Sequence, residues 1–199
     1  MSNSIIVAVD EFEVKKFYQV IDQLDPRKCM VKIGSISFNS MGHEIIHYAS
    51  DMGFEVFLDL KLHDIPNTVE KSIKGLSILP ISMLTIHVSG GMSMLKAAME
   101  GVHGTDIKVI GVTALTSLSD DDTNSIYKRN SSEHVKAMLE HAESSGIHGV
   151  VCSPHELNLV NQKESLISIT PGIRYKESKD DQKRTMSPAE AINLGADYI

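Results

Sequence analysis

Short hydrophobic runs of strand length alternate with amphipathic segments of helix length along the chain. Residues 4–10 form the first apolar run, and residues 13–24 follow with apolar positions at helical spacing. The same pattern predicts further strands at residues 30–34, 55–61, 83–88, 108–115, 149–153 and 168–173. It predicts further helices at residues 40–52, 66–79, 92–103, 131–145, 154–161 and 188–194, and a polar loop with three consecutive aspartates before residue 131.

This alternation predicts a parallel sheet, because successive parallel strands need a crossover segment between them. The strands are mostly apolar on both faces, which is typical of a sheet covered by helices. Residues 197–199 resemble the beginning of an eighth strand. Eight repeats of about 25 residues favour a (β/α)8 TIM barrel in one domain over residues 1–199, with an open doubly wound sheet as the alternative.

Composition narrows the possible functions of the chain. The net charge of −7 gives no general support for nucleic-acid binding. Two cysteines are too few for a disulfide framework or a four-cysteine zinc site. The N-terminus lacks the pattern of a signal peptide, and no stretch approaches the ~20 apolar residues of a membrane span. A cytoplasmic protein without membrane or nucleic-acid partners is therefore expected.

Polar residues gather at the carboxyl ends of the predicted strands. They are Asp10, Lys32, Asp59, Lys61, His87, Thr113, Thr116, Ser153 and Arg174. In a barrel these ends meet at one mouth, where such enzymes carry their chemistry. Helix capping explains some of the Asp and Ser residues without any function, but it does not readily explain two lysines.

Asp59 and Lys61 are two residues apart on one predicted strand, so they share a face, and Leu60 faces the helices. Asp64 follows in the strand-to-loop turn. Bringing these charges together costs desolvation energy unless they pair, and pairing keeps Lys61 protonated. A purely structural salt bridge is the alternative interpretation of this spacing.

The segment DLKLHDIPNT at residues 59–68 closely resembles the signature of orotidine 5′-phosphate decarboxylases. The resemblance continues in order along the chain, with IVAVD at 6–10, KIG at 32–34, HVSGG at 87–91, GVTALTS at 111–117, GVVCS at 149–153, TPGIR at 170–174 and DQKR at 181–184. So many ordered matches are far more specific than any single motif.

This resemblance implies a homodimeric barrel that decarboxylates orotidine 5′-phosphate to UMP and CO2 in pyrimidine biosynthesis, with shared active sites and no metal or organic cofactor. It implies that Lys61 donates a proton to C6 of the pyrimidine and that Asp59 lies beside the substrate carboxylate. Asp64 would reach in from the other subunit, and Lys32 would complete the charge array.

The resemblance also implies a set of substrate-binding residues. Asp10 and Lys32 would hold the ribose hydroxyls, with Thr68 helping across the interface. Thr116 would contact the pyrimidine amide, and Arg174 and Gln182 would belong to the phosphate-side loop. The rest of the signature is expected near the substrate as well: Leu60, Leu62, His63, Ile65, Pro66 and Asn67.

Two departures from the family pattern stand out. Ile36 occupies a position where many members carry an acidic residue. The chain also ends at Ile199, whereas the family continues through the eighth strand into a phosphate-binding Ile-Gly-Arg run and a final helix. We therefore expect the chain as given to lack its last strand and helix and to leave the barrel without its closure, with a tail missing from the given sequence as the favoured explanation. If the protein truly ended at Ile199, severe loss of stability and weak phosphate binding would be expected.

Other functions remain as alternatives. The segment HEIIH at residues 43–47 matches a zinc-protease pattern, but it falls on a predicted outer helix with no convincing third ligand. The related 3-keto-gulonate 6-phosphate decarboxylase shares the Asp-x-Lys-x-x-Asp motif and uses magnesium. A phosphate-ligand-binding protein without turnover is a further alternative.

Overall fold

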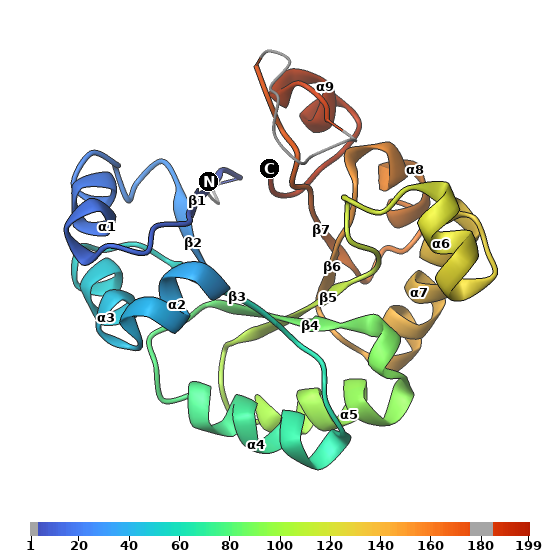
Figure 1. Ribbon diagram of the computed structural model, residues 1–199, viewed down its shortest axis with the longest axis horizontal. Helices are drawn as coiled ribbons and strands as arrows, with labels where there is room; N and C mark the ends of the chain where they lie inside the picture. The colour runs from blue at the N-terminus through green and yellow to red at the C-terminus, as the bar shows by residue number, and fades with distance from the viewer. Residues whose placement is uncertain (1–3, 176–184) are drawn as a thin grey trace.

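The computed structural model describes residues 4–175 and 185–199, and its strands curl into a parallel barrel surrounded by helices (Figure 1). The sheet has seven strands in sequence order, each pairing in parallel with the next. They are β1 (Ile6–Val9), β2 (Met30–Gly34), β3 (Val56–Leu62), β4 (Met83–His87), β5 (Lys108–Val112), β6 (Gly149–Val151) and β7 (Ile167–Ile169). The barrel predicted from the alternation of strands and helices is confirmed.

The last residues of the chain bridge the two edges of this sheet. Tyr198 donates its backbone N–H to Ser168 O (3.0 Å) and accepts from Thr170 N (2.9 Å). Ile199 donates to Ser4 O (2.8 Å) and accepts from Ile6 N (2.9 Å). The expectation of an unclosed barrel is therefore wrong for the backbone. Tyr198 pairs with the β7 edge and Ile199 with the β1 edge, so the two residues together link β7 to β1. Ser4, the first described residue, therefore lies beside Ile199.

A side-chain clip holds this closing segment in register. Asp197 Oδ2 accepts hydrogen bonds from Ser168 N (2.8 Å) and Ser168 Oγ (3.0 Å), and Asp197 N donates to the same Oγ (2.9 Å). Ser168 is fully buried on β7. The clip therefore fixes where the segment meets β7, since a slip would leave the buried N–H and hydroxyl of Ser168 without partners.

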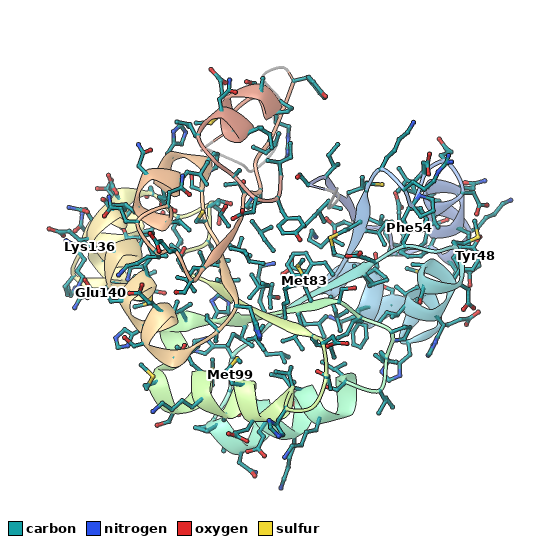
Figure 2. All side chains as sticks on the ribbon, turned by 180° about the vertical axis from the view of Figure 1, so that it is seen from behind. Tyr48, Phe54, Met83, Met99, Lys136 and Glu140 are labelled. Atoms are coloured by element: carbon teal, nitrogen blue, oxygen red, sulfur yellow. The ribbon has the colours of Figure 1, made fainter. Side chains whose placement is uncertain are left out.

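The hydrophobic core forms two layers, one inside the barrel and one between the sheet and the helices. The inner layer contains Met30, Phe57, Met83, Ile110 and Ile169. Met83 lies at the centre of the molecule in Figure 2, whereas Tyr48 lies at its periphery. Along β4, Leu84 and Ile86 join the outer layer. Strand alternation therefore directs Met83, Thr85 and His87 inward, and the inward positions become polar toward the carboxyl end.

Helices cover the outside of the barrel, with short 3-10 turns at η1 (Val88–Gly90) and η2 (Pro154–Glu156). The helices are α1 (Val14–Ile21), α2 (Ser35–Met41), α3 (Glu44–Asp51), α4 (Pro66–Leu76), α5 (Met92–Gly101), α6 (Asp120–Tyr127), α7 (Ser131–Ser145), α8 (Leu157–Val160) and α9 (Pro188–Asn193). Among the described residues, none of the helices is both long enough and apolar enough to cross a membrane.

Two predictions of local structure were wrong, one of a helix and one of a loop. The single helix expected at residues 40–52 is divided into α2 and α3, because Gly42 between them adopts φ +68°. The loop expected around the three aspartates contains α6. Ser119 caps this helix in a reciprocal capping box, and the aspartates occupy its first turn, where negative charge favours the helix dipole.

Candidate active site

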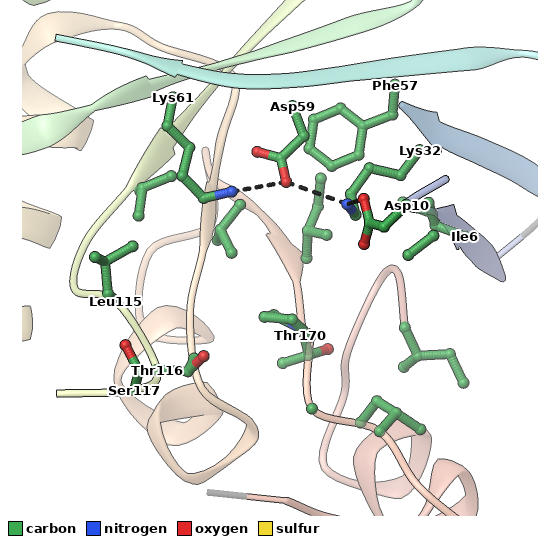
Figure 3. Close-up of a pocket in the computed structure, with 18 of the residues that line it drawn as sticks. Ile6, Asp10, Lys32, Phe57, Asp59, Lys61, Leu115, Thr116, Ser117 and Thr170 are labelled. Atoms are coloured by element: carbon green, nitrogen blue, oxygen red, sulfur yellow. Dashed lines mark hydrogen bonds and ion pairs between the residues drawn. The ribbon is translucent and has the colours of Figure 1, made fainter. Parts of the chain in front are cut away.

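Four alternating charges lie in a row at the carboxyl ends of the first three strands (Figure 3). Lys61 Nζ lies 2.8 Å from Asp59 Oδ2, and Lys32 Nζ lies 3.5 Å from the same oxygen. Lys32 Nζ also lies 3.4 Å from Asp10 Oδ1. The structure therefore brings together Asp10, Lys32, Asp59 and Lys61. Asp10 directly follows β1, Lys32 lies on β2, and Asp59 and Lys61 lie on β3.

The end of β3 is irregular, and this irregularity directs Lys61. Lys61 has φ +50°, and the pairing of β3 with β4 shifts register between Leu58 and Leu62. A left-handed backbone at a non-glycine residue costs about 1–2 kcal/mol and persists only where the surroundings impose it. Leu60 packs against the outer core while Asp59 and Lys61 face the mouth, so the predicted sharing of a face is confirmed.

Thr85 on β4 stabilises this strained strand end, and the sequence analysis missed it. Its hydroxyl donates to Asp59 Oδ1 (2.8 Å) and accepts from the backbone N–H of Lys61 (2.8 Å). Thr85 is fully buried. The available signal was a threonine inside an otherwise apolar strand, two residues before His87 and therefore on the same inward face.

The surroundings of Asp59 favour its charged form. Burial would by itself raise the pKa of Asp59, but Lys61 and Lys32, together with the hydrogen bonds from Lys61 and Thr85, lower that pKa below its usual value. Asp59 is only 8% exposed, so these charges are poorly screened by solvent. The carboxylate therefore remains an anion between two ammonium groups throughout the neutral range.

His87 ends β4 beside this array, and its ring lies 5.1 Å from that of His63. Burial lowers the pKa of His87, and the neighbouring His63 and Lys61 lower it further. The imidazole of His87 is therefore kept neutral next to Lys61. By contrast, Ser153 at the end of β6 caps the following turn through His155 N (3.4 Å), so capping explains this strand-end residue.

A cavity of about 490 Å³ opens in front of the charge row, a size typical of small-ligand pockets. Its floor is the apolar inner face of the barrel. Its opposite wall comes from the segments after β5 and β7, including Leu115, Thr116, Ser117, Thr170 and Arg174. Figure 3 shows Thr116 and Ser117 across the cavity from Lys61. Arg174 Nη1 donates to Ile173 O (2.8 Å).

The remaining signature residues do not line this cavity: Leu60, Leu62, His63, Asp64, Ile65, Pro66, Asn67 and Thr68. Leu60 and Leu62 face the outer core because alternation along β3 turns them away from the mouth. Asp64 is exposed, and its Oδ1 accepts from Ile65 N (2.7 Å). Pro66 then begins α4. Gln182 lies outside the described residues.

The HEIIH segment lies at the start of α3, on the outside of the barrel. Glu44 accepts a hydrogen bond from the hydroxyl of Tyr18 (3.2 Å), and the His43 ring lies beside Phe38. Within residues 4–175 and 185–199, no cluster of three or more His, Cys, Asp or Glu side chains is arranged to hold a metal ion.

A parallel barrel with an alternating charge row and a cavity at the carboxyl ends of its strands defines a TIM-barrel enzyme. The chain belongs to the orotidine 5′-phosphate decarboxylase / HUMPS family, whose sequence profile it matches over residues 3–199.

Individual relatives agree with this family membership. Orotidine 5′-phosphate decarboxylase from Ehrlichia canis is 41% identical over 200 residues, covering 99% of this chain and 88% of the relative. The enzyme of the same name from a Wolbachia pipientis strain is 42% identical with the same coverage. The crystal structure of orotidine 5′-phosphate decarboxylase from Lactobacillus acidophilus matches with a TM-score of 0.86 and 32% identity, covering 100% of this chain and 89% of that one.

Proposed function

We propose that this chain decarboxylates orotidine 5′-phosphate to UMP and CO2, a step of pyrimidine biosynthesis. The observation that carries the proposal is the Lys61 ammonium, held 2.8 Å from Asp59 at the entrance of a nucleotide-sized cavity. The named relatives with about 40% identity support the same reaction. A more distant barrel from Methanocaldococcus jannaschii, 21% identical, was crystallised with the inhibitor BMP.

Lys61 has the chemistry that this reaction needs. Loss of CO2 leaves a carbanion at C6, which the pyrimidine ring cannot delocalise well. An ammonium fixed beside that carbon stabilises the developing negative charge and then supplies the proton. One such contact at ~4 Å contributes roughly 4 kcal/mol at an effective dielectric near 20.

That contribution is well short of the ~20 kcal/mol by which the most effective enzymes lower their barriers. The remainder must come from a site arranged in advance and from binding energy at distant parts of the substrate. Here Lys32 and Thr85 fix the Asp59 carboxylate, and that carboxylate fixes Lys61. Asp59 remains anionic and lies beside the substrate carboxylate. The two negative charges repel each other until CO2 departs.

We propose that different walls of the cavity bind different parts of the nucleotide. Asp10 and Lys32 at one end are proposed to hold the ribose hydroxyls. Thr116 on the opposite wall is proposed to contact the pyrimidine amide, and Arg174 with Gln182 to form the phosphate side. Asp10, Lys32, Thr116 and Arg174 all line the one cavity, which supports this arrangement.

The decisive experiment follows the absorbance of orotidine 5′-phosphate with purified protein, with and without EDTA. We expect turnover that survives the chelator, because no step in the proposed mechanism uses a metal. Chelator-sensitive activity on a keto-sugar phosphate would instead indicate the related sugar-phosphate decarboxylase. Tight binding of UMP without turnover would indicate a binding protein.

We further propose that the active enzyme is a homodimer in which Asp64 and Thr68 serve the partner's site. Asp64 is exposed and lies outside the cavity of its own chain. Ile65 next to it is 66% exposed, and Ile36 after β2 is 53% exposed, so apolar side chains near the mouth are available for a second copy.

Mixing two inactive variants tests this shared site. In a heterodimer of Lys61→Ala and Asp64→Ala subunits both substitutions fall in the same site, because Asp64 serves the partner's site, so the other site is intact. Equal mixing after subunit exchange should restore about a quarter of the wild-type activity, since half of the dimers are mixed and each has one good site. Activity that stays at the level of the separate variants would contradict shared sites. Lys61→Ala mixed with itself is the control.

A further inference from the structure

The loop after β1 is fastened by a buried serine from α2. Ser37 Oγ lies 2.8 Å from Val9 O and 2.7 Å from Glu11 O, and it accepts a hydrogen bond from Glu11 N (3.0 Å). Ser37 is fully buried. All three contacts therefore fall on the two residues that flank Asp10, one of the four charges at the mouth.

These hydrogen bonds are not ordinary helix capping. Residue 34, rather than Ser37, is the N-cap of α2, and the partners of Ser37 lie 26 to 28 residues earlier in the sequence. One hydroxyl proton is shared between two carbonyl oxygens, while a lone pair receives the Glu11 amide. Ser37 therefore restrains the backbone on both sides of Asp10 rather than its own helix.

The Asp10 side chain needs such a restraint. Its contact with Lys32 is 3.4 Å long, and its side chain is 47% exposed, so this ion pair holds it weakly. The carboxylate instead lies directly over Gly34. A Cβ added to Gly34 would come within 2.8 Å of Asp10 Oδ1. The direction of the Asp10 side chain is therefore set by the position of its own backbone and by the lack of a side chain at Gly34.

We propose that Ser37 is a positioning residue for Asp10, holding its carboxylate at the angle that receives the vicinal ribose hydroxyls of the nucleotide. The inference rests on the proposed function and deepens it by naming the residue that positions Asp10 at the ribose end of the site. Two hydroxyl donors on adjacent carbons need both carboxylate oxygens in a fixed plane. If Asp10 rotated freely, part of the binding free energy would be used to fix its side chain, and less would remain to orient the substrate.

A comparison of two ligands tests this role. Titration calorimetry would measure UMP and 2′,3′-dideoxyuridine 5′-phosphate, which lacks both hydroxyls, against the wild type, Ser37→Ala and Ser40→Ala. Ser40 is the matched control, since its hydroxyl bonds only within α2, to Ile36 O (2.8 Å). We expect Ser37→Ala to weaken the binding of UMP roughly fivefold to tenfold, the contribution of about one hydrogen bond. The affinity for the dideoxy ligand should stay unchanged.

A double-mutant cycle separates positioning from general damage. If Ser37 acts through Asp10, adding Ser37→Ala to an Asp10→Ala variant should cause no further loss of UMP affinity. Full additivity, or an equal loss for both ligands, would overturn the proposal. Ser37→Cys keeps the size of the side chain with a weaker donor, and Gly34→Ala pushes the Asp10 carboxylate aside. Both variants should weaken the binding of UMP and leave the binding of the dideoxy ligand unchanged, as Ser37→Ala does. The test can therefore be made even if the alanine variant folds poorly.

Amide hydrogen exchange distinguishes failure of this inference from failure of the proposed function. Without any nucleotide, the Glu11 amide should be protected in the wild type and Ser40→Ala and should exchange faster in Ser37→Ala. Unchanged exchange would overturn the positioning role even in an active enzyme. Faster exchange in a protein that neither binds UMP nor turns over orotidine 5′-phosphate would refute only the proposed function.

Discussion

Replacing Lys61 by methionine is expected to lower kcat/KM for orotidine 5′-phosphate by roughly 10⁴-fold or more. The substitution removes both the cation beside C6 and the proton donor, effects that are each worth about 10²–10⁴-fold in other enzymes. Methionine keeps most of the length of the lysine side chain. It also adopts φ +50° with the same strain, so the strand end should be preserved.

The measurement is steady-state decarboxylation beside circular dichroism and thermal unfolding. Lys163→Met is the matched control, because Lys163 also forms a close ion pair, 2.6 Å from Glu143, on the outside of the barrel. The control should retain wild-type kcat/KM. If Lys61→Met kept a tenth of the wild-type activity while folded, Lys61 would not be the proton donor.

The arrangement of strands was predictable because parallel strands and their helices leave distinct periods in the sequence. Strand alternation likewise placed Asp59 and Lys61 on one face, since that inference needs only two residues of one strand. The inward direction of β4 is equally regular, with Met83 buried in the inner layer and His87 at the mouth.

Contacts between strands were harder to predict. Thr85 meets Asp59 only because β3 and β4 lie side by side, and the register shift between Leu58 and Leu62 is set by that pairing. The left-handed backbone of Lys61 has no local signal, because lysine carries no preference for it. A sequence read along one strand at a time does not contain these facts.

The closure of the barrel was underestimated for a related reason. The resemblance to the family predicts closure by a complete eighth strand, but closure needs only donors and acceptors that face both neighbours. Tyr198 and Ile199 provide them, and Asp197 holds their register through Ser168. Ser37 shows the same principle at the mouth, where a buried hydroxyl far along the chain fixes a loop that the local sequence leaves undefined.

Replacing Asp59 by asparagine should have the second-largest effect, a loss of kcat/KM of at least about 10³-fold, comparable to losing a principal electrostatic contact. Lys32 and Lys61 both lie within 3.5 Å of Asp59 Oδ2 in the wild type. Without the carboxylate, these two ammonium groups repel each other and lose their shared partner. Lys61 should then move away from C6, because the carboxylate that held its ammonium at the mouth is gone.

The same variant should change how stability depends on pH. Asp59 has a folded-state pKa below its ordinary value of 3.8, so its charged form stabilises the folded protein. That stability is fully present above pH 3.8 and is lost as the pH falls through the lower, folded-state pKa. In this acid window the unfolding free energy of the wild type should fall more steeply than that of Asp59→Asn.

Urea unfolding between neutral and acid pH measures the difference. Asp51→Asn, at the exposed end of α3, is the control and should follow the wild type. Parallel pH profiles for wild type and Asp59→Asn would show that the lysines do not favour the Asp59 anion. Wild-type turnover in Asp59→Asn would show that catalysis does not need the row of alternating charges. A loss of turnover at neutral pH in a folded variant, together with the flatter acid profile, would link both effects to the anion between Lys32 and Lys61.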